Sequence, residues 1–73
     1  MNPTGALVIV TMIGREFKKL RESTGLSQSQ LGRELDLYVR TISKYENDDL
    51  VIPKVTELAL RYVVQQAKQK ERR

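Results

Sequence analysis

Cysteine and histidine are both absent from this sequence. Without cysteine the chain can form no disulfide and no thiolate metal site, and without histidine it lacks the commonest metal ligand and general base. Its nine acidic residues are scattered rather than paired, and its four glycines form no phosphate-binding loop, so no ordinary pair of nucleophile and base can be built. We therefore predict a protein that is not an enzyme, with no cofactor and no metal site, in a reducing, intracellular setting.

Long hydrophobic runs are missing as well. The longest one, Ala6 to Val10, is too short to cross a bilayer, and no positive leader or small-residue cleavage pattern marks it as a signal peptide. We expect a soluble, cytoplasmic protein with no membrane partner. The run Leu7 to Val10 is also the one segment that could form a strand, so residues 1–11 are either a disordered arm or a short dimerisation strand.

Positive charge is what the chain has in excess. Thirteen basic residues against nine acidic ones give a net charge of +4 and a pI near 9.7. This balance is compatible with a polyanionic partner such as nucleic acid, although many basic proteins bind nothing acidic. Part of the excess lies in a basic tail, residues 70–73, which is either a solvated helix end or an auxiliary phosphate contact.

The chain of 73 residues is one small domain, and a domain of this size buries only about 60% of the surface that its unfolded form exposes. Its apolar residues recur at helical spacing. Thr11 can cap a first helix in which Ile13, Phe17 and Leu20 form one buried stripe, and this helix is expected to end near Thr24. We therefore expect a helical domain with a small core.

Two short helices are predicted in the middle of the chain. Ser27 with Gln30 three residues later is a capping box, which starts a helix over residues 28–35. Asp36 interrupts the pattern, and aspartate tolerates the left-handed conformation of a tight corner. A second helix over residues 39–46 follows directly, so the two helices meet across three residues.

After a loop over residues 47–53, Pro53 is well placed as the first residue of a last helix, expected to run over residues 54–69. The two short helices cannot be stable alone and must pack on the two long ones. The residues that can form this core are Leu31, Leu35, Leu37, Ile42 and Tyr45 together with Phe17, Leu20, Leu58 and Ala59.

That packing leaves the other side of helix 39–46 in water. Successive side chains of an α-helix are about 100° apart, so five residues of this helix fall together on its exposed side. A helix that enters a major groove requires such an exposed side. The residues on it are Val39, Arg40, Ser43, Lys44 and Asn47.

A family resemblance is carried by the segment TGLSQSQLGRELDLYVRTISKYEN, with Leu20-Arg21 before it and Pro53 and Leu58-Ala59 after it. From about Ile13 to Tyr62 the chain resembles the DNA-binding domain of the Cro and phage-repressor helix-turn-helix family, also called the xenobiotic-response-element type. The resemblance implies an all-α, lambda-repressor-like bundle of four to five helices over residues 12–69. It also implies a prokaryotic or phage-encoded transcriptional regulator, typically a dimeric repressor that inserts helix 39–46 into the major groove of a palindromic operator in double-stranded DNA.

The chain departs from the family pattern at three positions. Gly32 stands where the family favours alanine, which costs helix 28–35 up to about 1 kcal/mol but keeps the small side chain needed where the two helices cross. Asp36 replaces the usual corner glycine. Tyr38 replaces the usual serine or threonine cap, which forfeits about 0.5–2 kcal/mol. The phenol of Tyr38 either reaches a phosphate or packs over helix 28–35.

The resemblance also implies roles for individual residues. Arg40 is expected to make a bidentate contact to guanine and Val39 an apolar contact to a thymine methyl group. Lys44 contacts either a base edge or a phosphate, and Ser43 is a weaker candidate for a base contact. The residues assigned to phosphates are Gln28, Tyr38, Thr41, Asn47 and Lys54. Gln28 matches the family's phosphate-binding glutamine, Asn47 and Lys54 are either backbone contacts as in relatives or ordinary loop residues, and Thr41 is a weaker candidate. The residues that the family pairs as a structural ion pair are Arg21 and Glu46.

Dimerisation is expected because one such module contacts only about 600–1,000 Å² of protein surface, too little for tight specific binding. The last helix is apolar on most of its circumference, and something must bury both sides of it. Its predicted core stripe is Val55, Leu58, Ala59 and Tyr62. Its predicted homodimer interface is Leu60, Val63, Val64 and Ala67. The alternative is an antitoxin or adaptor that binds a different protein partner through this helix or through residues 1–11.

Overall fold

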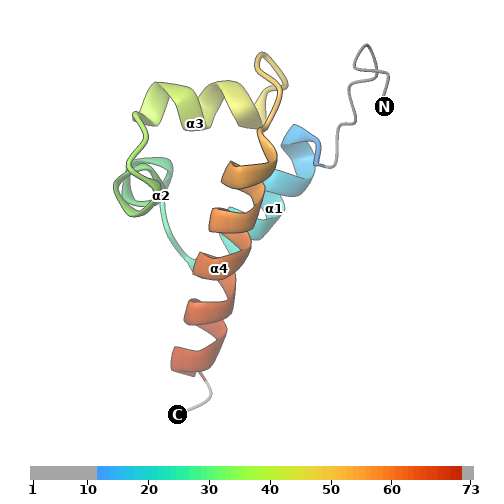
Figure 1. Cartoon of the computed structure of the whole chain (residues 1–73). Coiled ribbons are helices and arrows are strands. Elements are labelled where there is room, and N and C mark those ends of the chain that lie inside the picture. The colour runs from blue at the N-terminus through green and yellow to red at the C-terminus, as the bar shows by residue number, and fades with distance from the viewer. Residues whose placement is uncertain (1–11, 72–73) are drawn as a thin grey trace.

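The computed structural model describes residues 12–71, which form four helices and no strand: α1 (Gly14–Thr24), α2 (Gln28–Leu35), α3 (Val39–Glu46) and α4 (Lys54–Glu71). The predicted all-α fold is confirmed. α4 packs beside α1, α2 packs on α3 and α4, and α3 packs on α1. In Figure 1, α3 lies across the end of the molecule at which α4 begins. The predictions for residues 1–11 and for Arg72 and Arg73 lie outside the described residues.

One hydrophobic core joins the four helices. Phe17 of α1, Leu31 of α2, Ile42 of α3 and Leu60 of α4 are all fully buried. The ring of Phe17 packs on that of Tyr45, with the ring centroids 5.7 Å apart. Because helices of eight residues are unstable alone, α2 and α3 depend on this shared core for their existence. The buried hydrophobic residues are Met12, Phe17, Leu31, Ile42, Tyr45, Ile52, Leu60 and Val64.

The corner between α2 and α3 has the predicted bounds. The Ser27 hydroxyl oxygen accepts the backbone N–H of Gln30 at 3.1 Å, and the Gln30 side-chain oxygen accepts that of Ser27 at 2.8 Å, which completes the capping box. Asp36 ends α2 with φ at 60°, in the left-handed region. These interactions join residues only a few positions apart, so the sequence is sufficient to locate them.

The start of α1 differs from the prediction. Its N-cap is Ile13 rather than Thr11, and Ile13 is exposed while Met12 takes the buried place. The backbone N–H of Gly14 donates to the carboxylate of Asp48 at 2.8 Å. Asp48 lies 34 residues later, in the loop after α3, so periodicity within α1 gives no sign of this contact.

The phase of α4 is opposite to the prediction. Leu58 and Tyr62, predicted in the core, are exposed, and so is Val55. The helix has apolar residues on two opposite sides, and periodicity alone does not decide which side faces inward. Ile52, just before α4, is buried as Leu60 is. The side of α4 that carries Leu60 therefore faces α1 and α2. The predicted interface residues that instead face the chain's own interior are Leu60, Val63, Val64 and Ala67.

The start of α4 at Lys54 agrees with the predicted range over residues 54–69, and its carboxyl end is shifted by two residues. Pro53 precedes the helix rather than forming its first residue, and its carbonyl accepts the backbone N–H of Glu57 at 3.0 Å. The helix continues to Glu71, so Lys70 of the predicted tail is helical. None of the helices in residues 12–71 is long and apolar enough to span a bilayer.

Gly32 of α2 lies close to the backbone of Leu37, just after the corner. A Cβ atom at this position would lie 2.6 Å from the carbonyl oxygen of Leu37, which is a backbone atom. Gly32→Ala is therefore expected to destabilise the protein by about 1–2 kcal/mol through this clash, even though alanine is the better helix former. Urea unfolding measures the change. Ser29→Ala, at an exposed position of the same helix, is the control and should be nearly neutral. A Gly32→Ala variant as stable as the parent would contradict the close approach.

Candidate nucleic-acid interface

The outward side of α3 carries the residues that the sequence predicts to contact DNA. Ile42 and Tyr45 anchor the inner side in the core, which directs Arg40, Lys44 and Asn47 into solvent. Val39 is also exposed, and the flanking residues Thr41 and Ser43 are half-buried. The structure thus gives this helix the exposed side that the spacing predicted. Whether these side chains contact DNA remains a prediction.

Arg40 and Lys44 form no ion pair with any side chain of residues 12–71. Two unpaired cations one helical turn apart make the outer side of α3 electropositive. Cations in this arrangement attract phosphate and can donate to base edges in a major groove. Residues 12–71 contain no group of three side chains that could hold a metal ion.

Tyr38 stands at the N-cap of α3 with an extended backbone and makes no side-chain capping hydrogen bond. Its side chain is 84% exposed, so the ring does not pack over α2. The phenol is therefore free to reach a ligand beside the start of α3, as the first of the two predicted alternatives requires. The first turn of α3 is therefore held by backbone hydrogen bonds to the Tyr38 carbonyl, from Thr41 at 3.0 Å and from Ile42 at 3.2 Å.

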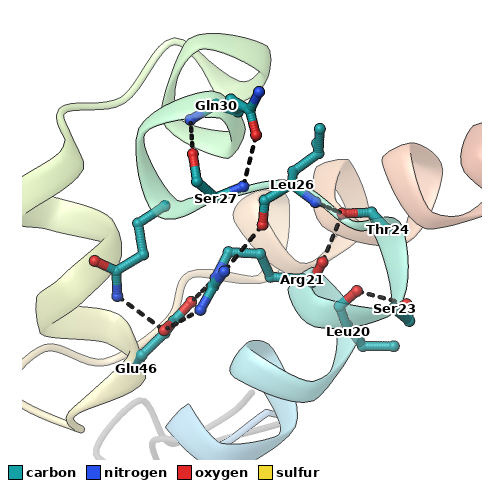
Figure 2. A network of polar contacts seen from close by, with 9 residues as sticks. Leu20, Arg21, Ser23, Thr24, Leu26, Ser27, Gln30 and Glu46 are labelled. Carbon is teal, nitrogen blue, oxygen red and sulfur yellow. Dashed lines mark hydrogen bonds and ion pairs between the residues drawn. The ribbon is translucent and has the colours of Figure 1, made fainter.

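The carboxyl end of α3 is held by a partly buried polar network, drawn in Figure 2. The Arg21 guanidinium donates from Nε to Glu46 Oε2 at 2.6 Å and from Nη2 to Oε1 at 3.2 Å, so the implied ion pair is present. Arg21 Nη1 also donates to the carbonyl of Leu26 at 2.9 Å. The hydrogen bond to Glu46 raises the pKa of Arg21 above its ordinary value, against the opposing effect of desolvation. The Arg21 guanidinium therefore stays charged throughout the physiological pH range.

Gln28, expected to contact a phosphate, belongs to the same network. Its side-chain Nε2 donates to Glu46 Oε1 at 2.9 Å. A side-chain amide nitrogen carries two hydrogens, so the second one stays available to another acceptor. Glu46 thus fixes the orientation of Gln28 at the start of α2. Local spacing does not predict this contact, because the two residues are 18 positions apart.

Lys54, another expected phosphate contact, is exposed at the start of α4. Its ammonium group lies 3.7 Å from the carboxylate of Glu57, and Arg61 Nε lies 3.0 Å from the other oxygen of that carboxylate. The side chain of Glu57 is only 5% exposed, whereas both cations reach solvent. The charge of Lys54 is therefore partly balanced within the chain, unlike the charges of Arg40 and Lys44.

Together, the two short helices, the tight corner and the exposed basic side of the second helix define a helix-turn-helix module. The model of the helix-turn-helix domain family matches residues 13–67, and the chain belongs to this family, in a form similar to the Cro/C1 type. No curated protein and no solved structure matches the chain significantly. Membership of this family suggests DNA as a partner of the protein.

Proposed function

We propose that the protein is a sequence-specific transcriptional regulator that binds double-stranded DNA as a dimer and represses by occupying a palindromic operator. The observation that carries the proposal is the outer side of α3, on which Arg40 and Lys44 are exposed and unpaired among the described residues. A regular helix with such a side has the dimensions that a major groove admits.

The recognition helix in this proposal is α3, and its support is rigid. Ile42 and Tyr45 are buried in the core, and Glu46 is tied to Arg21 of α1. A helix held in this way loses little conformational entropy when it binds, so more of the contact energy is left for affinity.

Base and backbone contacts are divided between two helices. Arg40 donates to the O6 and N7 atoms of one guanine, Val39 packs on a thymine methyl group, and Lys44 and Ser43 reach the neighbouring base edges. Gln28 donates its second amide hydrogen to a phosphate at the start of α2, an end at which helix N–H groups favour anions. Further phosphate contacts come from Tyr38, Thr41, Asn47 and Lys54, which position the protein without reading sequence.

Selection of bound duplexes from a random library at a stated salt concentration tests the function. A palindromic consensus is expected, with two half-sites one helical turn apart, because two recognition helices must enter successive major grooves about 34 Å apart. Selection that enriches no sequence would rule out sequence-specific recognition. An enriched single half-site would rule out the two-fold complex.

Arg40→Ala is expected to lower the affinity for the selected operator by about 1–3 kcal/mol and to relax the preference at one base pair of each half-site. Gln28→Ala should weaken binding to all sequences alike, because a phosphate contact carries no base information. Quantitative titration of the operator and of its single-base variants measures both effects.

Lys18→Ala is the matched control for the lost positive charge, since Lys18 is exposed on α1. This variant should keep the operator preference of the parent. If Arg40→Ala discriminates among the operator variants as the parent does, Arg40 does not read a base.

A further inference from the structure

Glu46, the last residue of α3, accepts hydrogen bonds from two other helices. The guanidinium of Arg21 in α1 donates to both carboxylate oxygens, at 2.6 and 3.2 Å, and the side-chain amide of Gln28 in α2 donates to Oε1 at 2.9 Å. Figure 2 shows the carboxylate of Glu46 facing the guanidinium of Arg21. One carboxylate thus joins the proposed recognition helix to a side chain that is assigned to a phosphate.

The charge of Glu46 is balanced without Gln28. Arg21 makes two hydrogen bonds to the carboxylate, and its Nη1 donates to the carbonyl of Leu26, just before α2. The ion pair is therefore complete as a link between α1 and α3. The amide of Gln28 adds a hydrogen bond but no charge, so a purely architectural role for Glu46 does not account for this bond.

The carboxylate determines which way the amide of Gln28 faces. A carboxylate paired with a guanidinium only accepts hydrogen bonds, so the NH2 group of Gln28, and not its carbonyl oxygen, points to Glu46. The Gln28 side chain makes no other hydrogen bond within residues 12–71. Because one amide hydrogen is bound and the amide group is planar, the direction of its second hydrogen is fixed as well.

An amide that is held in the free protein makes the phosphate contact more favourable. A glutamine side chain loses much rotamer freedom when it is fixed in place, and ordering such a side chain at an interface weakens the affinity. Gln28 is half-buried in the first turn of α2 and is already ordered by Glu46. Its ordering therefore takes place during folding and not during binding.

We propose that Glu46 is the positioning residue for the phosphate contact of Gln28, because its carboxylate holds the amide with the second hydrogen toward the DNA backbone. This inference rests on the proposed function. It also gives the ion pair, which the sequence assigns to architecture, a part in binding. Arg21 keeps the carboxylate in place, and Gln28 carries its effect to the DNA.

The orientation of Gln28 is tested first without DNA. NMR relaxation of the side-chain amides in the parent protein should show a Gln28 amide as rigid as the backbone of α2. The control is Gln65, which is exposed on α4 and whose side chain makes no hydrogen bond within the part of the chain that the structure describes. Its amide should move freely. Equal mobility of the two amides overturns the proposal.

Replacement of the acceptor tests the effect on binding. In the paired variant Arg21→Met with Glu46→Leu, Gln28 loses its acceptor, no charge is stranded and the net charge of the protein is unchanged. Its affinity for the selected operator should fall about two- to tenfold, the effect of ordering one long side chain. Circular dichroism confirms that the variant is folded.

Addition of Gln28→Ala to the paired variant separates positioning from architecture. If Glu46 acts through Gln28, this triple variant should bind the operator as Gln28→Ala alone does, because the two losses are one and the same. If the ion pair only supports the fold, its loss adds to that of Gln28→Ala. Additive losses, or a paired variant that binds as the parent does, overturn the proposal.

Operators in which one phosphate at a time is replaced by an uncharged methylphosphonate locate the contact. At one position the replacement should weaken binding by the parent, have little effect on Gln28→Ala and have a reduced effect on the paired variant. The preference for the base pair assigned to Arg40 should stay that of the parent, since a phosphate contact carries no base information. A changed base preference in the paired variant would mean that α3 has moved, which overturns the positioning role.

The failure of this inference and the failure of the proposed function give different results. If the Gln28 amide is rigid in the free protein but selection from the random library enriches no sequence, the regulator assignment falls, and the phosphate role of Glu46 falls with it. If an operator is selected but Glu46 and Gln28 contribute to its binding independently, the regulator stands and this inference falls.

Discussion

Glu46→Ala is expected to destabilise the protein by about 3 kcal/mol, the lower end of the cost of removing one partner from a buried ion pair, because this pair is partly buried. The Glu46 side chain is only 4% exposed and accepts hydrogen bonds from both Arg21 and Gln28. Alanine leaves the Arg21 guanidinium largely buried with the Leu26 carbonyl as its remaining acceptor among the described residues. A core of this size supplies only about 3–5 kcal/mol of net stability, so much of the protein should be unfolded at room temperature. Urea titration followed by circular dichroism measures the loss.

The matched control removes both charges together. In the double variant Arg21→Met with Glu46→Leu, no buried charge is stranded, and apolar residues of similar volume often replace an ion pair at little cost. This double variant should be more stable than Glu46→Ala alone. If Glu46→Ala instead costs less than about 1 kcal/mol, in the range of a surface pair, the network does not hold α3 in place.

Gly14→Ala is the second substitution with a large expected effect. A Cβ atom at Gly14 would lie 2.5 Å from the carbonyl oxygens of both Tyr45 and Glu46. These are backbone atoms at the end of α3, so neither can swing aside as a side chain does. Alanine normally stabilises a helix relative to glycine, but here we expect a loss of about 3 kcal/mol, at the upper end of the cost of overpacking.

Thermal unfolding of Gly14→Ala beside Arg15→Ala isolates the clash. Arg15 is the next residue of α1 and is exposed, so alanine there should change the stability little. In Gly14→Ala the start of α1 must move away from α3, which also lengthens the 2.8 Å hydrogen bond from the Gly14 N–H to Asp48. A Gly14→Ala variant with the melting temperature of the parent would mean that α1 and α3 can separate without cost.

Both substitutions act at the carboxyl end of the proposed recognition helix. There, α1 abuts the backbone of α3 at Gly14, and Arg21 binds Glu46. At the other end Tyr38 provides no side-chain cap. The side-chain contacts that position α3 are therefore concentrated at its carboxyl end, whereas its first turn carries the exposed residues Val39 and Arg40.

The sequence by itself was sufficient for the features whose interactions are local. The capping box of Ser27 and Gln30, the left-handed corner at Asp36 and the bounds of α2 and α3 all depend on residues within a few positions of one another. The exposed side of α3 followed from the same periodicity. The ion pair of Arg21 and Glu46 spans 25 residues and was anticipated only through the family resemblance.

Only the tertiary structure decided which side of α4 faces the core. Leu60 and Leu58 lie on two apolar sides of one helix, and hydrophobic burial, which is non-directional, does not distinguish them until Ile52 and the neighbouring helices are in place. The contacts of Gly14 with Asp48 and of Gln28 with Glu46 likewise join residues 34 and 18 positions apart. Composition, spacing and capping determined the helices and their corner, because those depend on neighbours along the chain. Packing determined the phase of α4 and the polar network, because those depend on neighbours in space.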